Sequence, residues 1–588
     1  MPDHMNDKIS IKSAPLLSTY NRKFLPGSFE INQWSDLEKY FLVLLNRLIE
    51  TPEALWCWMK DRSELETILQ EDLGWRYIKM SCDTANEEFK NGFNYFVAEI
   101  QPKIAPLSND LDHKLISSPF INQLNYPGLE IYLRQVRKRI EIYRDENIPL
   151  IADLQQLEQD YSAITGAMTV DVDGKELTLQ QASNFLREPD RQKRELVYRK
   201  IASRRMADRD KLDTLFNKLV KLRHQIALNA GFTNYRDYMF AALGRFDYTP
   251  EDCFAFHSSV AEEVVPICDV IDERHRKELN IDVLRPWDTE AEPAGNLPLQ
   301  PFRNASELVE KTISCFGKLD PFLAKCIQAL EQSKRFDLES RKGKAPGGYN
   351  YPLYESGLPF IFMNSTNTLR DLVTMVHEGG HALHSIVTKD LEIVDYKSCP
   401  SEVAELASMS MELMSMEYWD EFFKNDKELL RAKKQHLEKV LDILPWIAAV
   451  DAFQHWIYTN HDHTVEERRM AWKNIYIKFS GNAIDWTELE DFRENLWQSQ
   501  LHIFEVPFYY IEYGMAQLGA IAVWRNFKQN PGKAMKDYLA ALSLGYTKTI
   551  GDIYKTAGIR FDFTKGYINE LSSFVNEQVN AVTKEASR

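Results

Sequence analysis

The chain has 588 residues, of which 44% are hydrophobic and 27% charged, and its formal net charge at pH 7 is −16. Length alone would allow several domains, but the composition and the absence of a long linker are compatible with one large helical body. The acidic balance argues against nucleic acid as a partner, because phosphate binding needs clustered positive charge.

The sequence gives no sign of secretion or of a membrane span. No stretch approaches 18 uninterrupted apolar residues, and the first residues lack the apolar segment of a signal peptide. The seven cysteines are scattered, odd in number and without a C-x-x-C pair, as is typical of reduced thiols. We therefore expect a cytoplasmic protein without a membrane anchor.

Most of the chain is predicted to be helical, so the expected fold class is mainly α. Two strand signals interrupt the helices: residues 169–179 alternate around an Asp-Gly turn and predict a hairpin, and residues 357–364 predict a strand. Residues 284–301 are rich in Pro, Glu and Ala and predict a loop. Helical periodicity or strong helix-former content predicts helices over residues 29–72, 84–102, 127–163, 180–230, 251–279, 304–335, 368–390, 401–424, 427–458, 465–481, 486–500, 512–529 and 532–544.

The helix predicted at 368–390 carries the most informative motif, His377-Glu378-Gly379-Gly380-His381. Histidines four residues apart lie one helical turn and about 40° apart, so both rings can reach one Zn²⁺. Glu378 then lies beside the metal, where it can act on a bound water. Thr368 followed by Asp371 predicts a capping box at the start of this helix.

Two ligands leave a zinc ion incompletely held, so we expect a carboxylate from a second helix. Glu405 is the preferred candidate because it lies 24 residues after His381 and begins a Glu-x-x-Ser run inside a predicted helix. Glu402 is the competing ligand. If Glu405 binds the metal, Glu402 lies one turn earlier and can orient a ligand histidine.

The paired glycines Gly379 and Gly380 are unexpected inside a helix, where each costs about 1 kcal/mol relative to alanine. They indicate that the second ligand helix or a substrate approaches this backbone closely. His384 shares nearly the same face as His377 but lies about 10 Å along the axis. We expect His384 to be packed or to support the ligands.

Other histidines give weaker metal signals. His461 and His463 flank an aspartate in a polar turn, and Asp451 with His455 stands at i, i+4 on a predicted helix. Neither pair has a third partner at suitable spacing in the sequence, so we expect no metal there.

The chain resembles the thimet oligopeptidase and oligoendopeptidase F family of zinc peptidases, and more closely its oligoendopeptidase F branch. The resemblance rests on Asp371 to Ser385, on Val403 to Ser408 and on the tail block His502 to Gly514, with weaker echoes at 285–288, 347–349 and 359–364. It covers about residues 200–580. We therefore expect an N-terminal helical region at 1–195, containing the hairpin, and a catalytic region at 196–588.

The resemblance implies a deep central substrate channel and an oxyanion donor from the tail block. That donor is a phenol of Tyr509, Tyr510 or Tyr513, assisted by His502. Because the tail departs from the alternating tyrosines of the branch, the donor cannot be assigned to one residue. At least one of these tyrosines is expected to be only a packing residue.

In zinc peptidases of this kind an edge strand beside the metal helix pairs with the substrate backbone, and the strand at 357–364 is the candidate. The alternative is a core strand without a substrate role. Gly347, Gly348 and Tyr349 precede it and could form a flap.

The expected activity is hydrolysis of internal bonds in short oligopeptides, with one Zn²⁺ per chain held by His377, His381 and Glu405 and with Glu378 as general base. A helical dipeptidyl carboxypeptidase would share every ligand, and a catalytically silent peptide-binding protein would need a damaged site.

Overall fold

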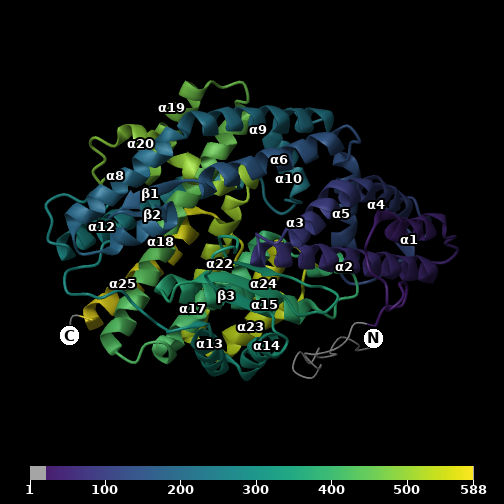
Figure 1. Cartoon of the computed structure of the whole chain (residues 1–588). Coiled ribbons are helices and arrows are strands. Elements are labelled where there is room, and N and C mark those ends of the chain that lie inside the picture. The colour runs from purple at the N-terminus through teal and green to yellow at the C-terminus, as the bar shows by residue number, and fades with distance from the viewer. Residues whose placement is uncertain (1–20, 587–588) are drawn as a thin grey trace. The chain divides into compact units, whose positions relative to one another are not determined.

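Helices make up most of the computed structural model, which describes residues 21–586, so the predicted mainly α fold class is confirmed. The described chain divides into two compact units, each assembled from three segments of the sequence. Figure 1 labels many of their elements. None of the helices within residues 21–586 combines the length and the hydrophobicity that a membrane span requires.

The first unit comprises residues 21–137, 300–429 and 519–560. It holds the metal-motif helix and the three-stranded sheet. Its elements are α1 (Trp34–Asn46), α2 (Pro52–Cys82), α3 (Glu87–Tyr95), η1 (Phe96–Ile100), α4 (Gln101–Ile116), η2 (Ile121–Gln123), α13 (Ala305–Leu319), α14 (Pro321–Gln332), β3 (Phe336–Glu339), β4 (Tyr349–Tyr351), β5 (Phe360–Ser365), α15 (Leu369–Thr388), α16 (Val394–Lys397), α17 (Ser401–Ser415), η4 (Met416–Glu421), α23 (Pro531–Ser543) and α24 (Ile550–Thr556).

The second unit comprises residues 138–299, 430–518 and 561–586. Three helices, α5 (Leu129–Ile142), α18 (Asp426–Thr459) and α22 (Tyr510–Gln529), have residues in both units. The remaining elements are α6 (Asn147–Gly166), β1 (Thr169–Val172), β2 (Lys175–Thr178), α7 (Leu179–Ser183), η3 (Asn184–Arg187), α8 (Arg191–Ala207), α9 (Arg209–Asn229), α10 (Tyr235–Ala242), α11 (Pro250–Glu263), α12 (Val265–Glu278), α19 (Val465–Phe479), α20 (Glu490–Glu494), η5 (Leu496–Ser499), α21 (Leu501–Glu505) and α25 (Lys565–Ala586).

Several long predicted helices are interrupted in the structure. The predicted helix 29–72 is broken because α2 begins at Pro52, which lacks an N–H to continue a helix, and because the Thr51 side chain accepts a hydrogen bond from the Ala54 N–H. Prolines likewise lie in the first turn of α12 and α14, which divide the predicted helices 251–279 and 304–335. The 22-residue helix α25 was not predicted.

The predicted hairpin is present as β1 and β2, which pair antiparallel around a turn at Asp173 and Gly174. Val170 and Val172 of β1 pack with Val197 of α8 in a small hydrophobic cluster. The domain boundary predicted at residue 195 stays a prediction.

The strand predicted at 357–364 is present as β5, but its assignment as an edge strand is wrong. The strand order is β3-β5-β4, so β5 is central, parallel to β3 and antiparallel to β4. Its residues Phe360 to Met363 are buried on both faces, which explains the continuous apolar run in the sequence. The edge strands are β3 and β4, and Asn350 of β4 donates a hydrogen bond to the Glu378 carbonyl of α15 at 3.3 Å.

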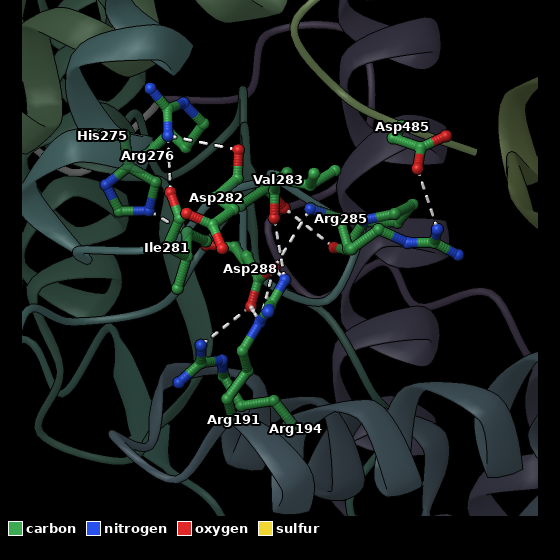
Figure 2. Close-up of polar contacts among 12 residues, drawn as sticks. Arg191, Arg194, His275, Arg276, Ile281, Asp282, Val283, Arg285, Asp288 and Asp485 are labelled. Carbon is green, nitrogen blue, oxygen red and sulfur yellow. Dashed lines mark hydrogen bonds and ion pairs between the residues drawn. The ribbon is translucent and has the colours of Figure 1, made fainter. Parts of the chain in front are cut away.

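The weak family echo at 285–288 is a structural anchor of the second unit (Figure 2). Asp288 is fully buried, and its carboxylate accepts hydrogen bonds from Arg191 at 2.8 Å and Arg194 at 2.8 Å, both on α8. It also accepts the Arg285 backbone N–H at 3.1 Å. Burial opposes ionisation of Asp288, but the two guanidinium groups hold its pKa below the ordinary value. The loop predicted at 284–301 is thereby fixed to α8.

Candidate metal centre

Helix α15 begins as the sequence predicts. Thr368 and Asp371 form the capping box, in which the Thr368 N–H donates to Asp371 Oδ2 at 2.8 Å. The helix then presents His377 and His381 on one face, with ring centroids 4.9 Å apart and ring planes inclined at 82°. Both rings are about one-fifth exposed, so they are accessible from one side.

Glu405 of α17 reaches both histidines. Its Oε2 lies 3.4 Å from His377 Nε2 and 3.6 Å from His381 Nε2. Zinc bonds to nitrogen and oxygen are about 2.0–2.2 Å, so neighbouring ligand atoms around a tetrahedral ion are about 3.3–3.6 Å apart. Both distances from Glu405 Oε2 therefore match the spacing of ligand atoms around tetrahedral zinc, and the donor set of two imidazoles and one carboxylate fits this metal.

Glu402 does not join this group. Among the described residues, the cluster of possible ligand atoms contains His377, His381 and Glu405. The Ser408 hydroxyl donates to Glu405 Oε2 at 3.0 Å and so fixes the carboxylate, which gives the Glu-x-x-Ser run a physical role.

The acid that orients His377 is Glu412, which the sequence analysis missed. Glu412 Oε1 lies 2.6 Å from His377 Nδ1, leaving Nε2 to face Glu405. A carboxylate on the far nitrogen fixes the tautomer and orientation of a ligand histidine. Glu412 follows Glu405 by seven residues, which is two helical turns, so both side chains lie on the same face of the helix. This spacing is the sequence feature that pointed to Glu412.

The paired glycines allow the close approach that the sequence predicts. A Cβ on Gly380 would lie 2.6 Å from Ser408 Cα and 2.7 Å from the Ala407 carbonyl oxygen, both in the backbone of α17. A Cβ on Gly379 would meet the Phe316 ring of α13 at 2.9 Å. The close neighbour at Gly380 is therefore the second ligand helix.

Burial and charge set the protonation of the motif. Burial raises the pKa of Glu378 to about 7. The nearby charge of His377 lowers this pKa, whereas the negative charges of Glu405 and Glu412 raise it. Burial lowers the pKa of His381 to about 4, so this ring is neutral at neutral pH, as a metal ligand must be. A carboxylate with a pKa near 7 can both accept and release a proton under physiological conditions.

The other histidines of the sequence analysis lie apart from this group. His384 is buried with Nε2 3.3 Å from Cys399 Sγ, which agrees with a packed residue. His461 stacks on the ring of His224 at 3.5 Å, and His463 Nδ1 lies 2.7 Å from the Asn460 carbonyl oxygen.

The tail residues form an aromatic cluster in the second unit. The ring of His502 lies 4.9 Å from that of Tyr510 and 5.9 Å from those of Tyr509 and Tyr513. Tyr510 is buried, and burial raises its pKa while hydrogen bonds with Trp446 and Gln500 oppose this rise. Tyr509 and Tyr513 are half-buried. The oxyanion role of these residues stays a prediction.

Comparison with known proteins identifies the family. Residues 184–573 match the model of Peptidase family M3, and residues 24–143 match the Peptidase M3 N-terminal domain. An oligoendopeptidase F homolog of Borreliella burgdorferi is 23% identical over 501 residues, which are 82% of this chain and 80% of the relative.

Solved structures agree with this result. PZ peptidase A, solved with an inhibitor, superposes with a TM-score of 0.88 at 28% identity over 95% of this chain and 99% of its own. A structure described as a putative oligoendopeptidase F gives a TM-score of 0.87 at 28% identity over the same shares of the two chains. The chain belongs to peptidase family M3, is similar to oligoendopeptidase F proteins, and is a peptide-bond hydrolase.

Proposed function

We propose that this peptidase is a zinc-dependent endopeptidase that hydrolyses internal bonds of short unstructured peptides. The observation that supports a metal is the position of the Glu405 carboxylate between two histidines. Its Oε2 atom lies 3.4 Å from His377 Nε2 and 3.6 Å from His381 Nε2. The names of the relatives, oligoendopeptidase F homolog and PZ peptidase A, support peptides as substrates. The cysteines form no disulfide among the described residues, which supports a reducing compartment such as the cytoplasm.

When bound, a zinc ion supplies Lewis acidity, which makes a water molecule acidic enough to lose a proton near pH 7. Glu378 accepts that proton on its carboxylate as the water attacks the scissile carbonyl. Glu378 then donates the proton to the leaving amine, so that one carboxyl group serves both steps. Its pKa of about 7 suits this exchange.

The main chain of β4 is the proposed partner of the extended substrate. As an edge strand, β4 has one side free of the ladder that it forms with β5. An extended peptide can add to such an edge by backbone hydrogen bonds. The bond from Asn350 to the Glu378 carbonyl ties β4 to the helix that carries the base.

The tail block completes the proposal, with a phenol donating a hydrogen bond to the developing oxyanion. Because Tyr510 is buried and hydrogen-bonded, we assign the donor to Tyr509 or Tyr513, with His502 beside both rings. One of the substitutions Tyr509→Phe and Tyr513→Phe should lower kcat about 10²–10³-fold. Tyr510→Phe should leave kcat within a few fold.

Cleavage of a defined peptide set, followed by mass spectrometry, tests the function. Each peptide is offered with a free and with an amidated C-terminus, with and without a chelator, and His377→Ala serves as the control for contaminating proteases. An endopeptidase cuts both forms at internal bonds and stops with chelator. Release of C-terminal dipeptides from the free form alone would instead show a dipeptidyl carboxypeptidase, and binding without cleavage would show a silent binding protein.

A further inference from the structure

A second group of metal-binding side chains lies in the second unit, on helices α11 and α18. Cys253 and His257 stand one turn apart on α11, and Asp451 and His455 stand one turn apart on α18. Residues four apart share a helix face, so each helix presents two donors. The Cys253 sulfur, a carboxylate oxygen of Asp451 and a ring nitrogen of His455 all lie within 4.8 Å of one another. The sequence analysis noted Asp451 and His455 but expected no metal there, because the third possible ligand, Cys253, lies on a helix nearly 200 residues earlier in the chain.

The group is deeply buried, and Asp451 and His455 carry polar atoms that make no hydrogen bond in the described chain. Cys253 and Asp451 have no exposed surface, and His455 is 3% exposed. His455 Nε2 lies 3.3 Å from Asp451 Oδ2, but within the described chain neither ring nitrogen of His455 makes a hydrogen bond, and the Asp451 Oδ1 atom makes none either. Buried polar atoms are normally paired, so these unpaired atoms on two neighbouring side chains indicate a ligand that both contact.

The surroundings favour a single small ion. The rings of Phe254, Phe508 and Phe240 lie 4.9, 5.3 and 5.9 Å from that of His455. These apolar walls strengthen any electrostatic interaction inside them. His257 Nε2 lies 2.8 Å from Asp451 Oδ2 and so can hold the carboxylate in place, as supporting residues of metal sites do.

We propose that Cys253, Asp451 and His455 bind a structural zinc ion, with His257 orienting Asp451. Thiolate, imidazole and carboxylate are the donors that zinc accepts, whereas calcium and magnesium bind oxygen alone. This site is independent of the proposed catalytic metal and raises the expected zinc content from one to two ions per chain.

The site has a structural consequence for the tail block. Gln454, between the two α18 donors, accepts the Phe508 backbone N–H at 2.7 Å, and the Phe508 ring packs against His455. Phe508 adopts φ 67°, a conformation that bulky residues rarely hold without support. An ion on His455 would therefore steady the backbone that leads into Tyr509.

Cobalt substitution tests the site apart from the catalytic centre. Protein produced with cobalt in place of zinc should show a thiolate-to-cobalt charge-transfer absorption, because Cys253 is the sulfur ligand, while the His377 site contains no sulfur. Cys253→Ala should abolish that absorption. Cys326→Ala, which removes an equally buried thiol on α14, should retain it.

Metal analysis of the zinc protein supplies a second measurement that needs no change at the new site. Wild-type protein should contain two ions per chain, and His377→Ala should keep one. The competing arrangement is a buried ion pair of Asp451 with protonated histidine. The proposal would be overturned if the wild type contained one zinc ion per chain, His377→Ala contained none, and the cobalt protein showed no thiolate absorption. This outcome does not depend on whether Cys253→Ala folds.

Discussion

The hydrogen bond between Glu412 and His377 makes a quantitative prediction about metal affinity. At 2.6 Å it is short and charge-assisted, and the Glu412 side chain is only 14% exposed. Glu412→Gln keeps the size and removes the charge. Loss of such a supporting carboxylate weakens metal binding about 10- to 100-fold, or about 1.4–2.7 kcal/mol. This range agrees with the roughly 1.5–3 kcal/mol of a hydrogen bond to a charged group.

The loss should depend on pH because the metal competes with a proton on His377. Burial opposes a charge on this ring, but its contacts with Glu405 and Glu412 raise its pKa well above the ordinary value. Below that pKa, zinc affinity should fall about tenfold for each pH unit. Glu412→Gln should lower the pKa of His377, so that a proton competes less strongly with zinc for this ring. The variant should therefore lose the full 10- to 100-fold in zinc affinity at alkaline pH and less at pH 6.

Zinc competition against a chromophoric chelator between pH 6 and 9 measures this effect. Glu417→Gln is the matched control, since Glu417 follows α17 and accepts a hydrogen bond from Trp524 Nε1 at 2.9 Å instead of from a histidine. The control should bind zinc like the wild type at every pH. An unchanged affinity in Glu412→Gln, or a loss that does not vary with pH, would refute the assignment.

Three further substitutions test the site. Glu378→Gln should retain zinc and peptide binding while turnover falls about 10²–10⁴-fold; normal turnover would mean that another group takes the proton. Glu405→Ala should lose one zinc ion per chain in metal analysis, whereas Glu402→Ala should keep the wild-type zinc content, and the reverse order would move the ligand. Gly380→Ala should lower the free energy of unfolding by about 1–3 kcal/mol in denaturant titration, because its Cβ would meet backbone atoms at 2.6 and 2.7 Å. Gly551→Ala, with nothing within 4 Å, is the control and should not destabilise the protein.

The parts of the site that lie on one helix could be predicted from sequence. His377, Glu378 and His381 share α15, and the capping box that begins this helix is also local. Spacing along one chain segment determines such arrangements, because a helix has a fixed pitch. The same reasoning predicted a carboxylate on the next helix and preferred Glu405 to Glu402.

The parts that depend on neighbouring segments could not be predicted. The central position of β5 depends on β3 and β4, which pair with it from both sides, and an apolar run alone does not distinguish a central strand from an edge. The partner of His377 likewise depends on the rotation of α17 about its axis, so Glu412 was missed. Cys253 and Asp451 meet only because α11 and α18 come together.

The spacing of the proposed metal ligands depends on a residue that is not one of them. Glu405 reaches His377 and His381 because α15 and α17 touch at Gly380, where the α17 backbone occupies the place of a side chain. A side chain at this position would push the helices apart, and ligand atoms now 3.4 and 3.6 Å apart would leave the tetrahedral range. The cost of a glycine inside α15, about 1 kcal/mol, is small beside the loss of one of the three proposed zinc ligands. The glycine that looks unfavourable for the helix is thus required by the geometry of the site.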